Sequence, residues 1–278
     1  MRQLLRVSVD LLREARARKS IYGPFAGVTL VLLLLGFFLR LDVVDGAIAG
    51  SRLFGAVLFD DIVQADVALK PVFMVAAYLA FYGGSLFLAV ACSDFAPNLL
   101  SPGRIEHLLS LPVARWQLLF GTYLGVIAMA LVTAAYGSAG VTVLFGIKTG
   151  LWTWRLFAGA LLGMAGFCSV YAAMLCLALF VRSAAAGAAL GVAMIGLGVV
   201  SSEREPISGW IEPGAGRLVF SALIKPFPRL QDLADAGARL AGERAFDATA
   251  TVKVALGALV FSAALLAVAA WRFERRDF

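Results

Sequence analysis

Charged residues are scarce in this 278-residue chain. Lys, Arg, Asp and Glu together make up 15% of it, whereas hydrophobic residues make up 61%. A soluble domain has roughly 25% charged and about 45–50% apolar residues. A chain with a mean hydropathy of +0.89 therefore has more apolar surface than one water-soluble core can bury, which excludes a soluble enzyme, a disordered chain and a fibrous repeat. We expect a membrane protein.

Residues that support catalysis or metal binding are also rare. His107 is the single histidine, and the three cysteines form no C-x-x-C pair and lie in or at the ends of apolar segments. We therefore predict no metal site, no disulfide framework and no enzymatic activity of this chain by itself. The chain also lacks the sequence G-x-x-x-x-G-K-[ST], so it has no P-loop with which to bind ATP.

The charge that is present has a basic excess, with 24 Lys and Arg against 18 Asp and Glu. These basic residues flank the apolar runs and do not gather on one solvated face. That distribution is typical of membrane proteins that contact anionic headgroups. We predict the lipid bilayer as a partner, and no nucleic acid.

Six apolar stretches are long enough to cross the hydrocarbon core of a bilayer, which is about 30 Å thick. The predicted fold class is therefore all-α, a polytopic membrane protein with a single domain over residues 1–278. Only Arg182 separates the fourth and fifth stretches, so we expect them to form a tight helical hairpin. The six predicted spans are 22–39, 71–92, 116–145, 156–181, 183–200 and 254–271.

Basic residues before the first span determine the predicted orientation. Six of the first 19 residues are Lys or Arg, and such clusters stay on the cytoplasmic side of a membrane. With six spans, both termini are then cytoplasmic, and the chain is a multi-pass protein of the cytoplasmic (inner) membrane. Residues 93–115 lie inside, and the segments 40–70 and 201–253 are outer loops.

Residues 1–20 have the pattern of an amphipathic helix. At about 100° per residue, an apolar face forms opposite a basic face. We predict an interfacial helix on the inner leaflet, which contacts headgroups or a protein partner with its arginines; a simple membrane anchor without a partner is the alternative. The basic face holds Arg2, Arg6, Arg13 and Arg16, and the apolar face holds Leu4, Leu5, Leu11, Leu12 and Ala15.

The central parts of the six spans contain no Asp, Glu, Lys, Arg or His. Ion-coupled carriers normally keep such a residue in the bilayer, so this absence disfavours a secondary carrier or an ion channel. Small residues recur as Gly121-x-x-x-Gly125, Gly159-x-x-x-Gly163 and Gly187-x-x-x-Gly191, which permit close helix packing within one bundle or between subunits. In the second outer loop, residues 229–244 have helical spacing, and we expect this helix to rest on the outer surface.

The loop between the second and third spans has the most specific pattern. It resembles the loop G-T-[LI]-E-x-L-L-x-x-P-[VI]-x-R of the permease subunits of type-2 ATP-binding-cassette (ABC) exporters. Arg104 stands where that family usually has Thr. The tail Phe273-Glu274-Arg275-Arg276-Asp277 is similar to the family's F-x-x-[RK]-[DR] ending. The residues that fit the loop pattern are Gly103, Ile105, Glu106, Leu108, Leu109, Pro112, Val113 and Arg115.

The resemblance implies a permease that forms the substrate pathway and a short cytoplasmic coupling helix that docks on an ATPase. It also implies two copies of a P-loop ATPase subunit, which bind ATP and Mg, and a second permease, expected to be identical. The alternatives are a secondary carrier or channel and a membrane assembly scaffold without transport. The substrate and the residues that contact it are not predicted. The expected coupling residues are Gly103, Arg104, Ile105, Glu106, His107, Leu108, Leu109, Pro112 and Arg115.

Overall fold

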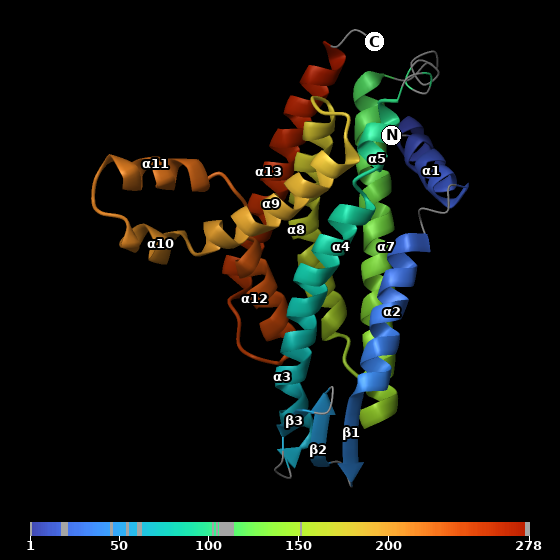
Figure 1. The fold of residues 1–278 in the computed structure, drawn as a ribbon, viewed down its shortest axis with the longest axis vertical. Coiled ribbons are helices and arrows are strands. Elements are labelled where there is room, and N and C mark those ends of the chain that lie inside the picture. The colour runs from blue at the N-terminus through green and yellow to red at the C-terminus, as the bar shows by residue number, and fades with distance from the viewer. Residues whose placement is uncertain are drawn as a thin grey trace.

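The computed structural model describes residues 2–17, 22–44, 47–53, 56–59, 63–101, 103, 105, 114–150 and 152–275. Long helices lie side by side in an elongated bundle, with a small sheet at one end and a helical arm projecting from one side (Figure 1). The expected helical architecture is confirmed, with five of the six expected spans found as long apolar helices. Five helical segments are long and apolar enough to cross a membrane: Leu69–Leu99, Arg115–Thr149, Arg155–Ala178, Ala184–Ser202 and Ala248–Glu274.

The first helix, α1 (Arg2–Ala17), has the expected amphipathic character and packs against α7 (Arg115–Thr149). The hydroxyl of Ser8 donates a hydrogen bond to the carbonyl of Gly121 at 2.9 Å. One turn later, Leu11 is buried against Gly125. The predicted Gly121-x-x-x-Gly125 motif therefore serves a contact within the chain, because two glycines let the backbone of α1 approach α7.

The first predicted span is the helix α2 (Tyr22–Phe38), which is apolar but has 17 residues. At 1.5 Å per residue it is about 26 Å long, slightly shorter than the hydrocarbon core of a typical bilayer. It runs parallel to the second half of α7, where Leu32 packs on Gly140. Lys148 of α7 donates a hydrogen bond to the carbonyl of Gly36 at 2.6 Å.

The first outer segment, expected as a loop, contains a small antiparallel sheet. Its strands are β1 (Leu39–Val44), β2 (Ala47–Leu53), β3 (Ala56–Phe59) and β4 (Val63–Gln64). Strand β2 pairs with β1, β3 and β4. Val44 pairs with Ala47, so the two residues between β1 and β2 are Asp45-Gly46, a dipeptide that strongly favours a β-hairpin. This dipeptide is visible in the sequence, but the segment was expected as a loop.

The second span is built from α3 (Ala65–Tyr78), a π-helical turn η1 (Leu79–Gly83) and α4 (Gly84–Ala91), followed by the short α5 (Phe95–Leu99). A π-turn inserts one extra residue and rotates the side chains that follow it. In this turn, Phe81 is buried and its ring lies beside Gly163 and Gly166 of α8 (Arg155–Ala178). The π-turn therefore places Phe81 of the second span against the glycines of the fourth.

The fourth and fifth spans form the predicted tight hairpin. Helix α8 ends at Ala178, and α9 (Ala184–Ser202) begins after Ser183, whose hydroxyl accepts the amide of Ala186 as an N-cap. The last span, α13 (Ala248–Glu274), is also N-capped. The Asp247 carboxylate accepts hydrogen bonds from Thr249 and from the amide of Ala250, and the Thr249 hydroxyl contributes most to lowering the pKa of Asp247.

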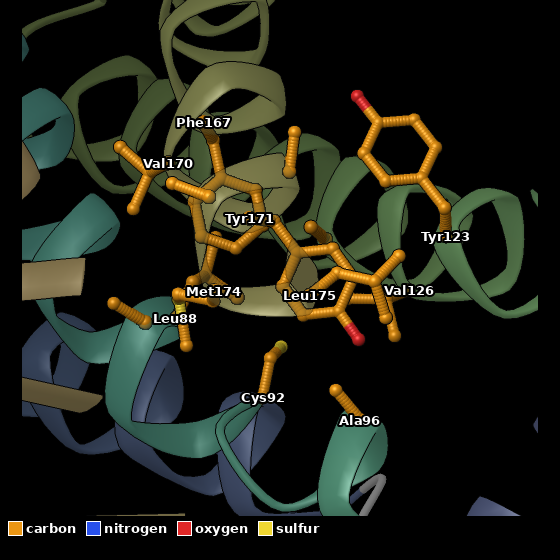
Figure 2. Close-up of a cluster of buried hydrophobic side chains, with 14 of the residues drawn as sticks. Leu88, Cys92, Ala96, Tyr123, Val126, Phe167, Val170, Tyr171, Met174 and Leu175 are labelled. Carbon is orange, nitrogen blue, oxygen red and sulfur yellow. The ribbon is translucent and has the colours of Figure 1, made fainter. Parts of the chain in front are cut away.

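The centre of the bundle is a cluster of large apolar side chains from α4, α7 and α8 (Figure 2). Tyr171 is completely buried there, and its ring stacks on Phe167 and Tyr123 with centroids 6.2 and 6.1 Å away. The hydroxyl of Tyr123 donates a hydrogen bond to the carbonyl of Cys168 at 3.2 Å. This contact aligns the first third of α7 with the middle of α8.

The second outer segment contains three helices, α10 (Arg204–Trp210), α11 (Ala215–Ile224) and α12 (Leu230–Ala241). Helices α10 and α11 form the arm that projects sideways from the bundle (Figure 1). Helix α12 returns to the bundle and packs against α3, α8 and α9. The predicted helix within 229–244 is therefore confirmed, but its expected place on the outer surface is not.

A substitution at Gly125 tests the docking of α1. A Cβ atom there would lie 3.1 Å from Leu11 and 3.3 Å from the carbonyl of Ser8. We expect Gly125→Leu to displace α1 and to lower the free energy of unfolding by about 1–3 kcal/mol, as overpacking does. The maleimide reactivity of a cysteine at position 8, in a chain whose native cysteines are alanine, should rise.

Gly83→Leu is the matched control, because no atom lies within 4 Å of a Cβ at that position. Equal reactivity of the position-8 cysteine in the Gly125→Leu and Gly83→Leu chains would mean that α1 does not depend on this glycine.

Candidate functional site

The predicted coupling residues are described only in part. Arg104, Glu106, His107, Leu108, Leu109 and Pro112 lie outside the described residues. Gly103 has φ of +79°, a left-handed conformation that suits glycine, in agreement with the turn expected there. Ile105 is 3% exposed and belongs to the main hydrophobic core, so it holds this segment to the bundle. Arg115 donates a hydrogen bond to the carbonyl of Glu274 at 3.2 Å and links the ends of α7 and α13.

The arginines predicted on the basic face of α1 are consistent with an interfacial helix where they are described. The side chains of Arg13 and Arg16 are exposed, and Arg13 lies 3.6 Å from Asp10 in a solvent-exposed ion pair. Those of Arg2 and Arg6 lie outside the described residues. Because α1 packs its opposite face on α7, these two exposed arginines point away from the bundle and are available to headgroups or a partner.

The three small-residue motifs all serve contacts inside this chain. A Cβ on Gly191 would collide with Ala89 and Met174, and one on Gly198 would collide with Leu230. The second motif brings α8 and α12 together, since a Cβ on Gly159 would lie 3.7 Å from the Cα of Gly237. Gly191 and Gly198 of the fifth span therefore face neighbouring helices of the same chain, whereas Gly196 is exposed.

Helix α12 lies antiparallel to α8 and covers its first half. Leu230, the first residue of α12, packs on Gly166, which is in the middle of the 24-residue α8. Seven residues later along α12, Gly237 meets Gly159, which is seven residues earlier along α8. The matching intervals keep the two helices in contact along their length. A helix expected on the surface thus begins beside the middle of a membrane-length helix.

The end of α12 is held by an ion-pair cluster. The carboxylate of Glu243 lies 3.3 Å from Lys70 of α3 and 3.2 Å from Arg155 of α8. Glu243 has φ of +55°, which non-glycine residues seldom adopt. A residue persists in this conformation where its surroundings hold it, and here two cations from two spans do so. The cluster connects α3, α8 and the end of α12.

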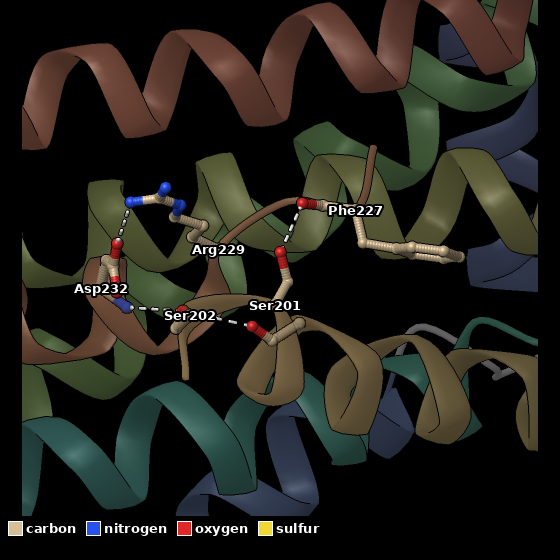
Figure 3. A network of polar contacts seen from close by, with 6 residues as sticks. Ser201, Ser202, Phe227, Arg229 and Asp232 are labelled. Carbon is tan, nitrogen blue, oxygen red and sulfur yellow. Dashed lines mark hydrogen bonds and ion pairs between the residues drawn. The ribbon is translucent and has the colours of Figure 1, made fainter. Parts of the chain in front are cut away.

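The start of α12 is joined to the end of α9 by a polar network (Figure 3). The Ser201 hydroxyl donates to the carbonyl of Phe227 at 2.8 Å, and the amide of Asp232 donates to the Ser202 hydroxyl at 3.3 Å. Arg229 lies 3.6 Å from the Asp232 carboxylate. Since Leu230 packs on Gly166, this polar network lies close to the apolar middle of α8.

A second polar contact joins α12 to the second span. The hydroxyl of Tyr78 in α3 donates a 2.7 Å hydrogen bond to the carboxylate of Asp235. Together with the Glu203–Gln231 hydrogen bond of 2.9 Å, it ties the polar face of α12 to both α3 and α9. These interactions satisfy carboxylates that would otherwise be costly to place among apolar helices.

An open cavity of about 310 Å³ lies between α13 and residues 225–229, which connect α11 to α12. Three cationic side chains line it, Lys225 after α11, Arg229 before α12 and Lys253 in the second turn of α13. The apolar side of the cavity is formed by α13 at Val254 and Gly257. This arrangement can bind an anion beside an apolar surface.

Neither this cavity nor the packing of α12 against α3, α8 and α9 was predicted from the sequence. Lys225 and Lys253 are 28 positions apart along the chain. No sequence pattern predicts that Lys253 lies close to Lys225 and Arg229. The close packing of α12, in contrast, has a signal in the sequence. Ala234, Gly237, Ala238 and Ala241 line one face, and a face of small residues is typical of helices that pack closely in membranes.

The comparisons with known proteins identify no family. No protein-family model matches the chain, and no match was found among curated proteins. The resemblance of residues 103–115 to ABC exporter permeases therefore stays a prediction.

A pair of cysteines tests the position of α12. In a chain whose native cysteines are alanine, we expect Gly159→Cys and Gly237→Cys together to form a disulfide on mild oxidation. A Cβ on Gly159 would lie 3.7 Å from the Cα of Gly237, within the geometric range of a disulfide. The disulfide is detected as a mobility shift after cleavage between the two positions.

The control pair is Gly159→Cys with Gly257→Cys, since no atom lies within 4 Å of a Cβ on Gly257. Failure of the first pair to form a disulfide, with both thiols reactive toward a small maleimide, would contradict the packing of α12 on α8.

Proposed function

We propose that this chain is the permease subunit of an ABC exporter, with ATP hydrolysed by a separate P-loop subunit. The observation that supports it best is the position of α12. A helix that carries Asp232 and Asp235 lies between spans whose own centres have no charge. Polar groups at such depth are costly and usually belong to a substrate pathway. Here the outer segment provides the polar surface, so the charge-free spans are compatible with transport.

The cytoplasmic end of the bundle supports a route for coupling. The segment 102–113 is connected to the bundle at both ends, through buried Ile105 on one side and through the Arg115–Glu274 hydrogen bond on the other. A force on this segment therefore reaches α7 and α13. In the proposal, Glu106, Leu108 and Leu109 dock on the ATPase, as the resemblance implies, and the ATPase supplies ATP and Mg.

The proposal includes a second copy of the permease and two ATPase subunits. The motif Gly187-x-x-x-Gly191 does not support the homodimer, because both glycines are buried within the chain. The second copy therefore rests on the resemblance.

A secondary carrier is the second candidate, and one observation favours it. Asp235 is a carboxylate held by Tyr78 of the second span, and carboxylates within membrane bundles often act as proton relays. The two candidates differ in their energy source. Transport by a carrier requires an ion gradient, whereas transport by a permease requires ATP hydrolysis in a partner.

A double substitution tests the coupling segment. We expect Glu106→Arg combined with Leu109→Asp to abolish stimulation of the ATPase rate when the chain is purified together with its P-loop subunit. The reason is the loss of one charge pair and one apolar contact at the docking surface, and a buried charge pair alone costs about 2–5 kcal/mol when broken. The measurement is the ATPase rate of the complex in lipid nanodiscs.

Glu212→Arg is the control for charge reversal, because Glu212 is exposed on the arm beyond α10. Wild-type ATPase stimulation by the double variant would show that 103–111 is not the coupling site. Transport that depends on a proton gradient and not on ATP hydrolysis would favour the secondary carrier instead.

Single cysteines test the proposed orientation. With both termini cytoplasmic, a cysteine at Arg244 should react with an impermeant maleimide added to intact cells, and one at Arg182 should react only after the membrane is opened. Both side chains are exposed, so reactivity reports the side of the membrane. The opposite labelling pattern would reverse the orientation.

A further inference from the structure

We propose that the cavity lined by Lys225, Arg229 and Lys253 binds the phosphate group of an anionic phospholipid. This inference does not depend on the transport proposal, because it requires only that the chain lies in a bilayer. The cavity has a volume of about 310 Å³ and opens to the surface of the protein. That volume is at the lower end of ligand pockets, which suits a headgroup with its acyl chains outside.

The positive charges that line the cavity favour binding of an anion. Arg229 is paired with Asp232 at 3.6 Å, and among the described residues neither Lys225 nor Lys253 forms an ion pair. Both lysine side chains are exposed, so their ammonium groups are accessible to an anionic headgroup. A bound phosphate would compensate them.

The start of α12 adds a further source of positive potential. Arg229 is the N-cap residue of this 12-residue helix and its own side chain caps no amide, while the Ser202 hydroxyl accepts the amide of Asp232. The first amides of a helix and its dipole favour an anion. The cavity therefore combines two lysines that form no ion pair among the described residues with the start of α12.

The apolar side of the cavity indicates that the phosphate belongs to a lipid. Val254, Gly257 and Ala258 of α13 form this side. Leu256 and Val260 of the same helix are 55% and 68% exposed, so the surface beside the cavity is also apolar. No atom lies within 4 Å of a Cβ on Gly257, so the cavity is not closed at that position. Acyl chains can lie along α13 while the headgroup reaches the lysines.

Lipid binding to the purified full chain tests the proposal. The protein in a neutral detergent is titrated with phosphatidylglycerol, with phosphatidylcholine of the same acyl chains and with inorganic phosphate, and bound molecules are counted by native mass spectrometry. We expect phosphatidylglycerol to bind and to raise the Tm, and phosphatidylcholine to bind far more weakly. Lys225→Gln with Lys253→Gln should weaken phosphatidylglycerol binding about tenfold to a hundredfold, as loss of charge-assisted hydrogen bonds does.

Two further variants separate binding from folding. Arg182→Gln with Arg244→Gln removes the same charge from exposed positions elsewhere and should leave binding unchanged. Gly257→Leu fills the apolar side where nothing obstructs it, so it should abolish lipid binding without lowering the Tm of the lipid-free protein. Equal binding of the two lipids, or wild-type affinity in both the double-lysine and Gly257→Leu variants, would overturn the proposal. Inorganic phosphate that binds as tightly as phosphatidylglycerol would overturn the lipid assignment.

Discussion

The close approach of α12 to α8 is the constraint on which the outer half of the structure depends. At Gly159 and Gly237 the two backbones touch because neither residue has a side chain. Without that approach, α12 would lie farther from the bundle, and neither the Glu243 cluster nor the polar network with α9 would form. Small residues allow this packing where burial of apolar surface gives little driving force between helices in a lipid environment.

This packing changes what the outer segment can contribute to function. The spans carry no charge at their centres, and a bundle made from them alone would offer an apolar interior. Helix α12 brings two carboxylates to that bundle: that of Asp232 is paired with Arg229, and that of Asp235 accepts a hydrogen bond from Tyr78. The arm formed by α10 and α11 then begins and ends near the same point, beside the cationic cavity. The cavity and the arm therefore both depend on where α12 begins.

Much of the helical fold followed from hydrophobic length. The predicted spans 116–145 and 156–181 correspond to α7 and α8, and the turn at Arg182 separates α8 from α9 as expected. The sheet between Leu39 and Gln64 was missed, although Asp45-Gly46 signalled a hairpin. Helix α12 was found by its spacing, but its packing against α3, α8 and α9 was not predicted, because amphipathicity is the same for a helix on a surface and for one packed between other helices.

The sequence by itself determined the long apolar helices and the amphipathic faces, because each depends on residues that are close in the chain. Composition and period are local properties, and a helix satisfies all its backbone hydrogen bonds within one segment. Only the tertiary structure decided which glycines face which helices and that Lys225, Arg229 and Lys253 share one cavity. Those relations join residues far apart in the chain, and they arise from the combined packing of several helices.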